Sequence, residues 1–187
     1  METRVLSVRE MKKEEIPMVV DYWCGAEPTY LKSLGVDLDR MPSPEDLQRM
    51  LHDQLGKSYE KKPAYCITWL VDGVPSGHSN INRIAFGEEA SMHLHLWHGH
   101  ARRRGLGSKL IQLTLPFYFD NFALNRLVCE PFALNPAPEK ALQQSGFVFE
   151  KEYTTIPGTI NFMQPVKRYI LTRSAFERSR SLAGITE

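Results

Sequence analysis

Residues 91–113 constrain the fold of this chain more than any other segment. Residues 92–97 alternate between apolar and polar side chains, which is typical of a β-strand. A basic loop with two glycines follows at 102–107, and apolar residues at helical spacing begin at Leu110. Glycines let a backbone approach an anion closely, and the free N–H groups of a first helical turn favour negative charge. A strand, a glycine-containing loop and a helix start in this order predict a phosphate-binding element.

Length and composition favour a single globular domain without a nucleic-acid or membrane partner. The chain has 187 residues, of which 42% are hydrophobic and 24% charged, as in ordinary soluble proteins. A net charge of +1 gives no basic surface of the kind that binds nucleic acid. Apolar runs are too short for a membrane span or a signal peptide. The three cysteines lie far apart, which suits a reducing compartment, so we expect a cytoplasmic protein.

Hydrophobic periodicity predicts one mixed α/β domain over residues 1–173, followed by a polar C-terminal tail or frayed helix over 174–187. Residues 24–43 are rich in turn formers and are expected to be irregular. Ser43 should cap the next helix, and Gly77 indicates a bulge or a close backbone approach. The predicted strands cover residues 5–9, 64–71, 74–85, 92–97, 126–130, 147–153 and 166–172, and the predicted helices cover 12–23, 44–55, 108–123 and 135–145.

Two motifs and this β-α-α-β-β-β-α-β-α-β-β order resemble the GNAT superfamily of N-acetyltransferases. Arg102, Gly105 and Gly107 fit the superfamily's pyrophosphate-loop pattern, Gln/Arg-x-x-Gly-x-Gly/Ala. The segment 135–147 resembles its Asn-x-x-Ala…Gly-Phe helix, and Asn-Pro-Ala-Pro at 135–138 loosely resembles the Asn-x-Ala-Ser pattern of the branch that acetylates ribosomal-protein N-termini. The resemblance implies a GNAT fold with a splayed central sheet.

The resemblance implies that acetyl-coenzyme A (acetyl-CoA) is the co-substrate. Its pyrophosphate would bind the loop and the first helical turn, and its pantetheine would lie along the end of the central strand. A backbone N–H near Leu96 or Trp97 would polarise the thioester carbonyl. The predicted cofactor-binding residues are Leu96, Trp97, His98, Arg102, Arg103, Arg104, Gly105, Leu106, Gly107, Ser108, Lys109, Asn135 and Pro138.

The central strand also carries the predicted catalytic residues. An attacking amine must be neutral, so a base has to remove a proton. His93 and His95 share one strand face, and a histidine pKa of about 6.5 suits this role. We predict His95 and then His93 as the base, with Glu89 as a water-relay partner.

The sequence does not identify the group that donates a proton to the departing thiolate. Many family members supply a tyrosine where this chain has Leu142, and the ribosomal-protein branch supplies a serine where it has Pro138. The hydroxyl of Tyr118, or water, could substitute for them.

We therefore expect an N-acetyltransferase that transfers acetyl to a primary amine by direct attack in a ternary complex. The acceptor, either a small-molecule amine or a protein N-terminus or lysine, would bind between residues 24–56 and loop 154–165. One alternative is a non-catalytic acyl-CoA sensor or interaction module. Others are a purely structural role for the histidines and a metal site on the His-x-His pair, which lacks an evident third ligand, so no metal is expected. Asn135 can also serve only as a helix cap. A homodimer through the C-terminal strands remains open.

Overall fold

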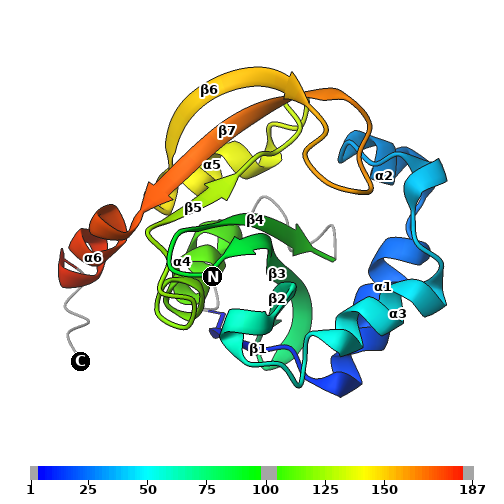
Figure 1. Ribbon diagram of the computed structural model, residues 1–187, viewed down its shortest axis with the longest axis horizontal. Coiled ribbons are helices and arrows are strands. Elements are labelled where there is room, and N and C mark those ends of the chain that lie inside the picture. Colours follow the sequence, from blue (N-terminus) through cyan, green and yellow to red (C-terminus); the bar gives the residue numbers. More distant parts are fainter. Residues whose placement is uncertain (1–3, 98–104, 183–187) are drawn as a thin grey trace.

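The computed structural model describes residues 4–97 and 105–182, which form one mixed sheet flanked by helices (Figure 1). The strands are β1 (Leu6–Glu10), β2 (Ala64–Val71), β3 (Val74–Ala85), β4 (Glu89–Leu96), β5 (Arg126–Cys129), β6 (Val148–Thr155) and β7 (Gln164–Thr172). The α-helices are α1 (Ile16–Cys24), α2 (Pro28–Ser33), α3 (Pro44–Asp53), α4 (Leu106–Phe119), α5 (Ala137–Gln144) and α6 (Arg173–Leu182). This α/β architecture confirms the predicted fold class. None of the described helices is long and apolar enough to cross a membrane.

The described sheet has the strand order β1-β2-β3-β4-β5-β7-β6. β4 and β5 run parallel, and the other neighbouring strands are antiparallel. The predicted strands 64–71 and 74–85 are β2 and β3, joined by a turn in which Asp72 and Gly73 both have positive φ, 53° and 78°. Such a turn matches the twist of a hairpin. The predicted meander from residue 64 to the central strand is therefore confirmed.

The sheet opens between β4 and β5, as the family resemblance implied. These strands pair only over Glu89–Arg126, Ala90–Leu127 and Ser91–Val128. β4 then continues to Leu96, whereas β5 ends at Cys129, and the two strands diverge in Figure 1. Among the described residues, β4 is therefore not paired with β5 beyond Ser91.

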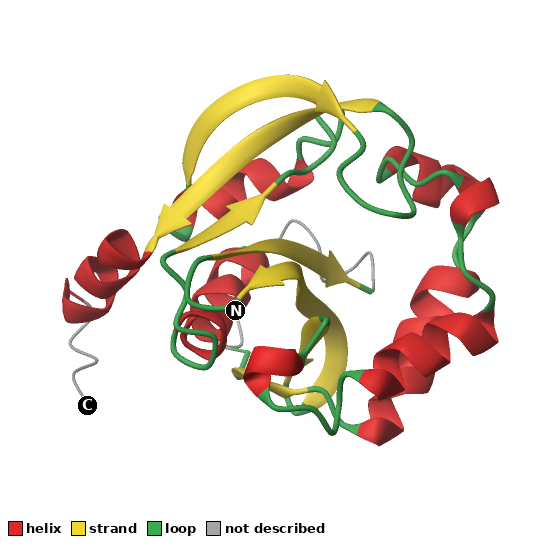
Figure 2. Cartoon of the chain, viewed as in Figure 1, coloured by secondary structure: helices red, strands yellow, loops and turns green. Residues whose placement is uncertain are grey.

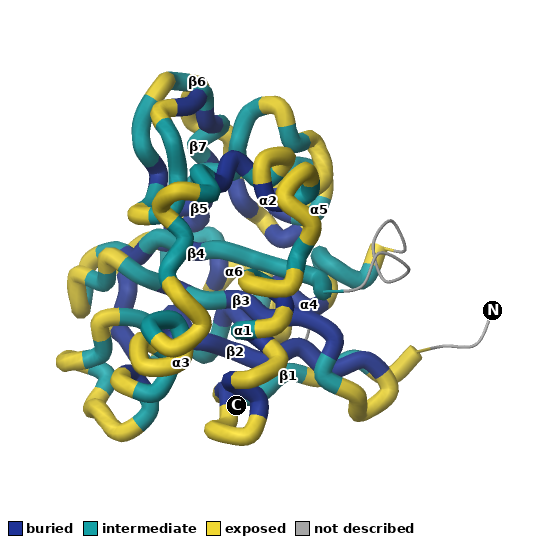
Figure 3. The backbone as a smooth tube through the Cα atoms, turned by 90° about the vertical axis from the view of Figure 1, so that its right-hand side faces the viewer, coloured by how far each residue is buried: buried dark blue, intermediate teal, exposed yellow. Residues whose placement is uncertain are grey.

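The hydrophobic core lies between the sheet and α4. Leu110, Ile111 and Phe119 of this helix are fully buried, and Figure 3 shows the buried stretch along β2, β3 and α4. Trp69 of β2 donates a hydrogen bond from Nε1 to Thr114 Oγ1 at 2.8 Å, which anchors α4 on the sheet. The helix runs three residues beyond Pro116, which sits inside it.

The segment predicted to be irregular, 24–43, contains the short helix α2 and a 3-10 turn at Leu38–Arg40. Pro28 at the first helical turn favours this start. The segment is tied to the loop between β6 and β7, because Val36 forms an isolated antiparallel bridge with Asn161 and the Asp37 N–H donates to the Ile160 carbonyl at 2.8 Å. Figure 2 shows this loop beside α2, on the same side of the molecule as α1 and α3.

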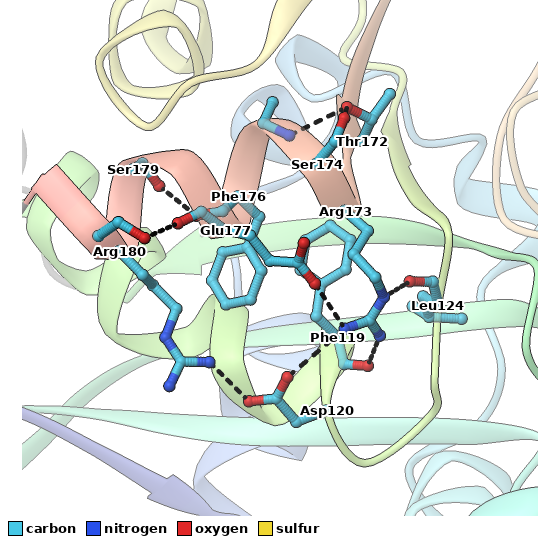
Figure 4. A network of polar contacts seen from close by, with 12 residues as sticks. Phe119, Asp120, Leu124, Thr172, Arg173, Ser174, Phe176, Glu177, Ser179 and Arg180 are labelled. Atoms are coloured by element: carbon cyan, nitrogen blue, oxygen red, sulfur yellow. Dashed lines mark hydrogen bonds and ion pairs between the residues drawn. The ribbon is translucent and has the colours of Figure 1, made fainter. Parts of the chain in front are cut away.

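Residues 173–182 form α6, which packs against the end of α4 (Figure 4). The rings of Phe119 and Phe176 stack at 4.5 Å, and Phe176 is buried. The Arg173 guanidinium donates to the Leu124 carbonyl at 2.7 Å and to the Phe119 carbonyl, and it also faces Asp120.

Candidate active site

The first turn of α4 presents backbone N–H groups at the opening in the sheet. Gly105 caps the helix with a left-handed φ of 71°, which glycine adopts at low cost, and a Cβ there would meet nothing within 4 Å. Leu106, Gly107, Ser108 and Lys109 follow in the first turn, where the N–H groups have no intrahelical partners. The predicted cofactor residues His98 and Arg102–Arg104 lie outside the described residues and stay predictions.

α5 packs against this first turn. A Cβ on Gly107 would lie 3.5 Å from Ala141 Cβ, and Ser145 Oγ donates to the Ser108 carbonyl at 3.1 Å. Asn135 Oδ1 accepts a hydrogen bond from the Ala137 N–H at 3.2 Å, so its side chain caps the start of α5. Pro138 is half-buried in the first turn of that helix.

The end of β4 is held tightly against β3. A Cβ on Gly77 would lie 2.5 Å from the His95 carbonyl oxygen, so only glycine fits there, as expected from the sequence. The Trp97 N–H donates to the Ser76 carbonyl at 3.0 Å. Leu96 and Trp97 are both half-buried at this edge.

A cavity of about 600 Å³ adjoins the end of β4. Its wall combines aromatic rings with two exposed carboxylates, and it contains no lysine or arginine among the described residues that line it. The lining residues are Met18, Asp21, Tyr22, Gly25, Ala26, Glu27, Tyr30, Pro75 and Trp97. Its volume is that of a small-molecule site.

One wall of this cavity leads to His95. The Tyr22 hydroxyl lies 3.2 Å from His95 Nδ1 and 3.0 Å from the Tyr30 hydroxyl. Behind His95, the imidazole of His78 stacks on it at 4.9 Å and accepts a hydrogen bond from Trp97 Nε1 at 2.7 Å. Burial lowers the pKa of His78 to about 3, so this neighbour of His95 is neutral at physiological pH.

The acetyltransferase (GNAT) domain model matches residues 6–148, which is most of the chain. The chain belongs to the GNAT acetyltransferases. It is therefore an acetyl-CoA-dependent N-acetyltransferase. No curated protein matches the sequence.

Solved acetyltransferases share the fold of this GNAT enzyme. Aminoglycoside acetyltransferase AAC(6')-Ib in complex with coenzyme A has a TM-score of 0.71 and 16% identity, over 94% of this chain and 99% of that chain. Spermidine N-acetyltransferase from Vibrio cholerae in complex with CoA and spermine has a TM-score of 0.74 and 15% identity, over 92% and 98%. RimL, a ribosomal L7/L12 alpha-N-protein acetyltransferase, has a TM-score of 0.72 and 14% identity, over 91% and 95%. At these identities the likeness concerns the fold.

The second predicted base of this acetyltransferase, His93, has different surroundings from His95. Its Nε2 lies 3.2 Å from Asn82 Oδ1. Burial first, and then the positive charge of Arg83, lower its pKa to about 4, against which Glu130 acts weakly. A neutral imidazole with so low a pKa is a weak proton acceptor near pH 7.

The structure does not bring Glu89 together with the two histidines. Its carboxylate Oε2 pairs with Arg126 Nε at 2.5 Å, at the first residue of β4. His95 lies six positions along the strand from Glu89, a span of about 20 Å. A relay through one water does not cover that distance.

Neither Leu142 nor Tyr118 is placed to donate a proton to the departing thiolate. Leu142 is fully buried in the core. Tyr118 is also fully buried, donates its hydroxyl to Ser79 Oγ at 2.9 Å, and has a pKa that burial raises well above 10. No group of three His, Cys, Asp or Glu side chains suitable for a metal occurs within 4–97 and 105–182.

Sequence reasoning missed three residues that surround His95 or line the cavity: Tyr22, Tyr30 and His78. His78 was detectable in principle, because the β3–β4 register pairs it directly with His95. Tyr22 and Tyr30 come from α1 and α2, and no local pattern indicates that these helices meet β4.

Proposed function

We propose that this enzyme transfers the acetyl group of acetyl-CoA directly to a primary amine held in the cavity at the end of β4. One observation carries the proposal: the cavity adjoins both Trp97, beside the expected thioester position, and the Tyr22 hydroxyl that contacts His95. Acceptor, co-substrate and base are thereby assigned to one place, as a ternary complex requires.

The cavity favours a small cationic amine as the acceptor. Asp21 and Glu27 are exposed on its wall, and carboxylates attract alkylammonium groups. The rings of Tyr22, Tyr30 and Trp97 offer faces for the same cations. A volume of about 600 Å³ suits a small molecule better than a folded protein surface. The spermidine and aminoglycoside acetyltransferases with this fold act on acceptors of this class.

The residues at the opening of the sheet fit acetyl-CoA. The first turn of α4 from Leu106 to Lys109 suits the pyrophosphate, and the β5 side of β4, beyond its last pair with β5 at Ser91, suits the amides of the pantetheine arm. The Trp97 N–H already donates to the Ser76 carbonyl, so another backbone N–H at this end of β4 would stabilise the oxyanion that forms when the amine attacks the thioester carbonyl.

In this mechanism, His95 takes the proton that the amine loses as the new C–N bond forms. The C–S bond then breaks, and the thiolate of coenzyme A takes a proton from water, since Leu142 and the buried Tyr118 supply none. His95 is preferred to His93 because the pKa of His93 is only about 4.

The test is acetyl-CoA turnover, followed by release of the free thiol, across diamines, polyamines, aminoglycosides and a short peptide with a free N-terminus. We expect turnover with the cationic small amines and a loss of about 100-fold or more in kcat for His95→Ala. His52→Ala on α3 is the matched control and should keep wild-type kcat.

A second function, acyl-CoA sensing without catalysis, is favoured by one observation: Leu142 and Pro138 stand where relatives carry a proton donor. Tight coenzyme A binding without turnover on any of these amines would support the sensor and contradict the enzyme.

A further inference from the structure

Two tyrosine hydroxyls connect the acceptor cavity to the proposed base. Tyr30 comes from α2 and Tyr22 from α1, and both line the cavity. Their hydroxyl oxygens are 3.0 Å apart, and the Tyr22 oxygen is 3.2 Å from His95 Nδ1. These distances are those of hydrogen bonds, so Tyr22 can bond to Tyr30 and to the imidazole at the same time.

Neighbouring rings surround His95 at the end of this hydrogen-bonded series. His78 stacks on its ring, and the bond from Trp97 Nε1 fixes His78 with its Nδ1 as the acceptor. His78 is 2% exposed and remains neutral, so no positive charge from this side opposes a proton arriving on His95. The ring of Trp23 also packs edge-on against His95 at 4.7 Å, where it favours one ring orientation.

A purely structural role for the hydroxyls is the competing explanation. Tyr22 is 9% exposed, and its ring packs edge-on against Trp23 and His78, which a phenylalanine would do equally well. The hydroxyl adds the contacts to Tyr30 and His95. Those contacts point from the cavity to the imidazole, which a packing role does not require.

We propose that Tyr30 and Tyr22 form a proton relay between the acceptor amine and His95. This inference rests on the proposed function. As the amine attacks, its nitrogen loses one proton to the Tyr30 oxygen. Tyr30 passes its own hydroxyl proton to Tyr22, and Tyr22 passes its proton to His95 Nδ1. Both phenols end neutral and His95 ends as imidazolium, so protons and charge balance. The relay removes the need for direct contact between the amine and the imidazole.

The test uses Tyr22→Phe and Tyr30→Phe, which keep the rings and remove only the hydroxyls. We expect kcat to fall about 10- to 100-fold in each, with an unchanged KM for acetyl-CoA. The wild-type proton inventory in mixed H₂O and D₂O should be curved, because several protons move together, and should become linear in Tyr22→Phe. Tyr59→Phe is the matched control, since its hydroxyl donates to Glu10 at 2.6 Å and lies outside this network. It should behave as the wild type.

A double variant separates the relay from packing. Because Tyr22 acts through His95, Tyr22→Phe should cost nothing further in kcat in a His95→Ala background. Additive losses would overturn the relay, and so would wild-type kcat with a curved inventory in Tyr22→Phe.

Imidazole ¹⁵N NMR of the resting enzyme tests the arrangement without turnover. Tyr22→Phe should shift the His95 Nδ1 resonance, whereas Tyr59→Phe should not. If no amine is acetylated while this shift is present, the proposed function fails and the Tyr22–His95 hydrogen bond stands. If the shift is absent, the relay fails whatever the activity.

Discussion

Gly77→Ala is the most informative single change, because the added Cβ would collide with the backbone of the candidate site. A Cβ at this position would lie 2.5 Å from the His95 carbonyl oxygen and 3.3 Å from Leu96 Cα. Real Cβ atoms essentially never come closer than 3.0 Å, so the carbonyl must retreat by about 0.5 Å, the difference between the two distances. Backbone atoms within a paired strand cannot rotate away as a side chain can.

Two effects of this change can be measured separately. Overpacking of this kind costs about 1–3 kcal/mol in the free energy of unfolding. A 1 Å misplacement of catalytic groups can cost about 100-fold, so a shift of half that size predicts a fall of about ten-fold in kcat. Urea denaturation gives the first quantity, and acetyl-CoA turnover under saturating substrates gives the second.

Gly56→Ala is the matched control for this prediction. A Cβ there meets nothing within 4 Å, so it should leave kcat unchanged and stability the same or slightly higher. A Gly77→Ala enzyme with the urea midpoint and kcat of the wild type would refute the claim that β3 fixes the position of His95.

Three further predictions concern stability. On acidification, the free energy of unfolding measured with urea should fall less in His78→Gln than in the wild type. The unfolded chain protonates His78 below about pH 6.5, whereas the folded chain does so only at about pH 3. Between these two pH values the wild type therefore loses about 1.4 kcal/mol of stability per pH unit, or about 2 kcal/mol by pH 5. A pH-independent difference between the two proteins would contradict a neutral buried imidazole. Arg173→Met should cost about 1.5–3 kcal/mol and expose α6 to trypsin, because the carbonyls of Leu124 and Phe119 lose their donor, whereas exposed Arg178→Met should do neither. Ser43→Ala should cost about 0.5–2 kcal/mol in thermal or urea unfolding, since the Asp46 N–H loses its 3.1 Å acceptor, and Ser43→Thr should restore most of it.

Much of the fold was readable from local patterns. The β2–β3 hairpin follows from β-branched and aromatic residues on either side of Asp72-Gly73, and α3 begins where Ser43 accepts from the Asp46 N–H. The segment 24–43 was not readable in this way. Its conformation depends on the bridge between Val36 and Asn161, and such a contact leaves no trace in the residues around either partner.

The candidate site, too, could be predicted from the sequence only in part. Strand parity places His93 and His95 on one face of β4, but it does not distinguish their environments. That distinction comes from Asn82 and Arg83 near the first and from Tyr22 near the second, 73 residues away in the chain. By the same alternation Glu89 lies on the face of β4 that carries the two histidines, but its distance along the strand is too large for a relay to His95.

The bridge between residues 35–37, just after α2, and the β6–β7 loop has a consequence for how this protein folds and opens. It joins segments more than a hundred residues apart, as in the hydrogen bond from Asn161 Nδ2 to the Gly35 carbonyl, which spans 126 positions. Closing so long a loop lowers the chain entropy considerably before the contacts that compensate for this loss can form. We therefore expect this bridge to form after the β2–β3–β4 meander and to open first under native conditions. Amide hydrogen exchange at Asp37, whose N–H donates to the Ile160 carbonyl, should be faster than at the buried ladder positions of β2.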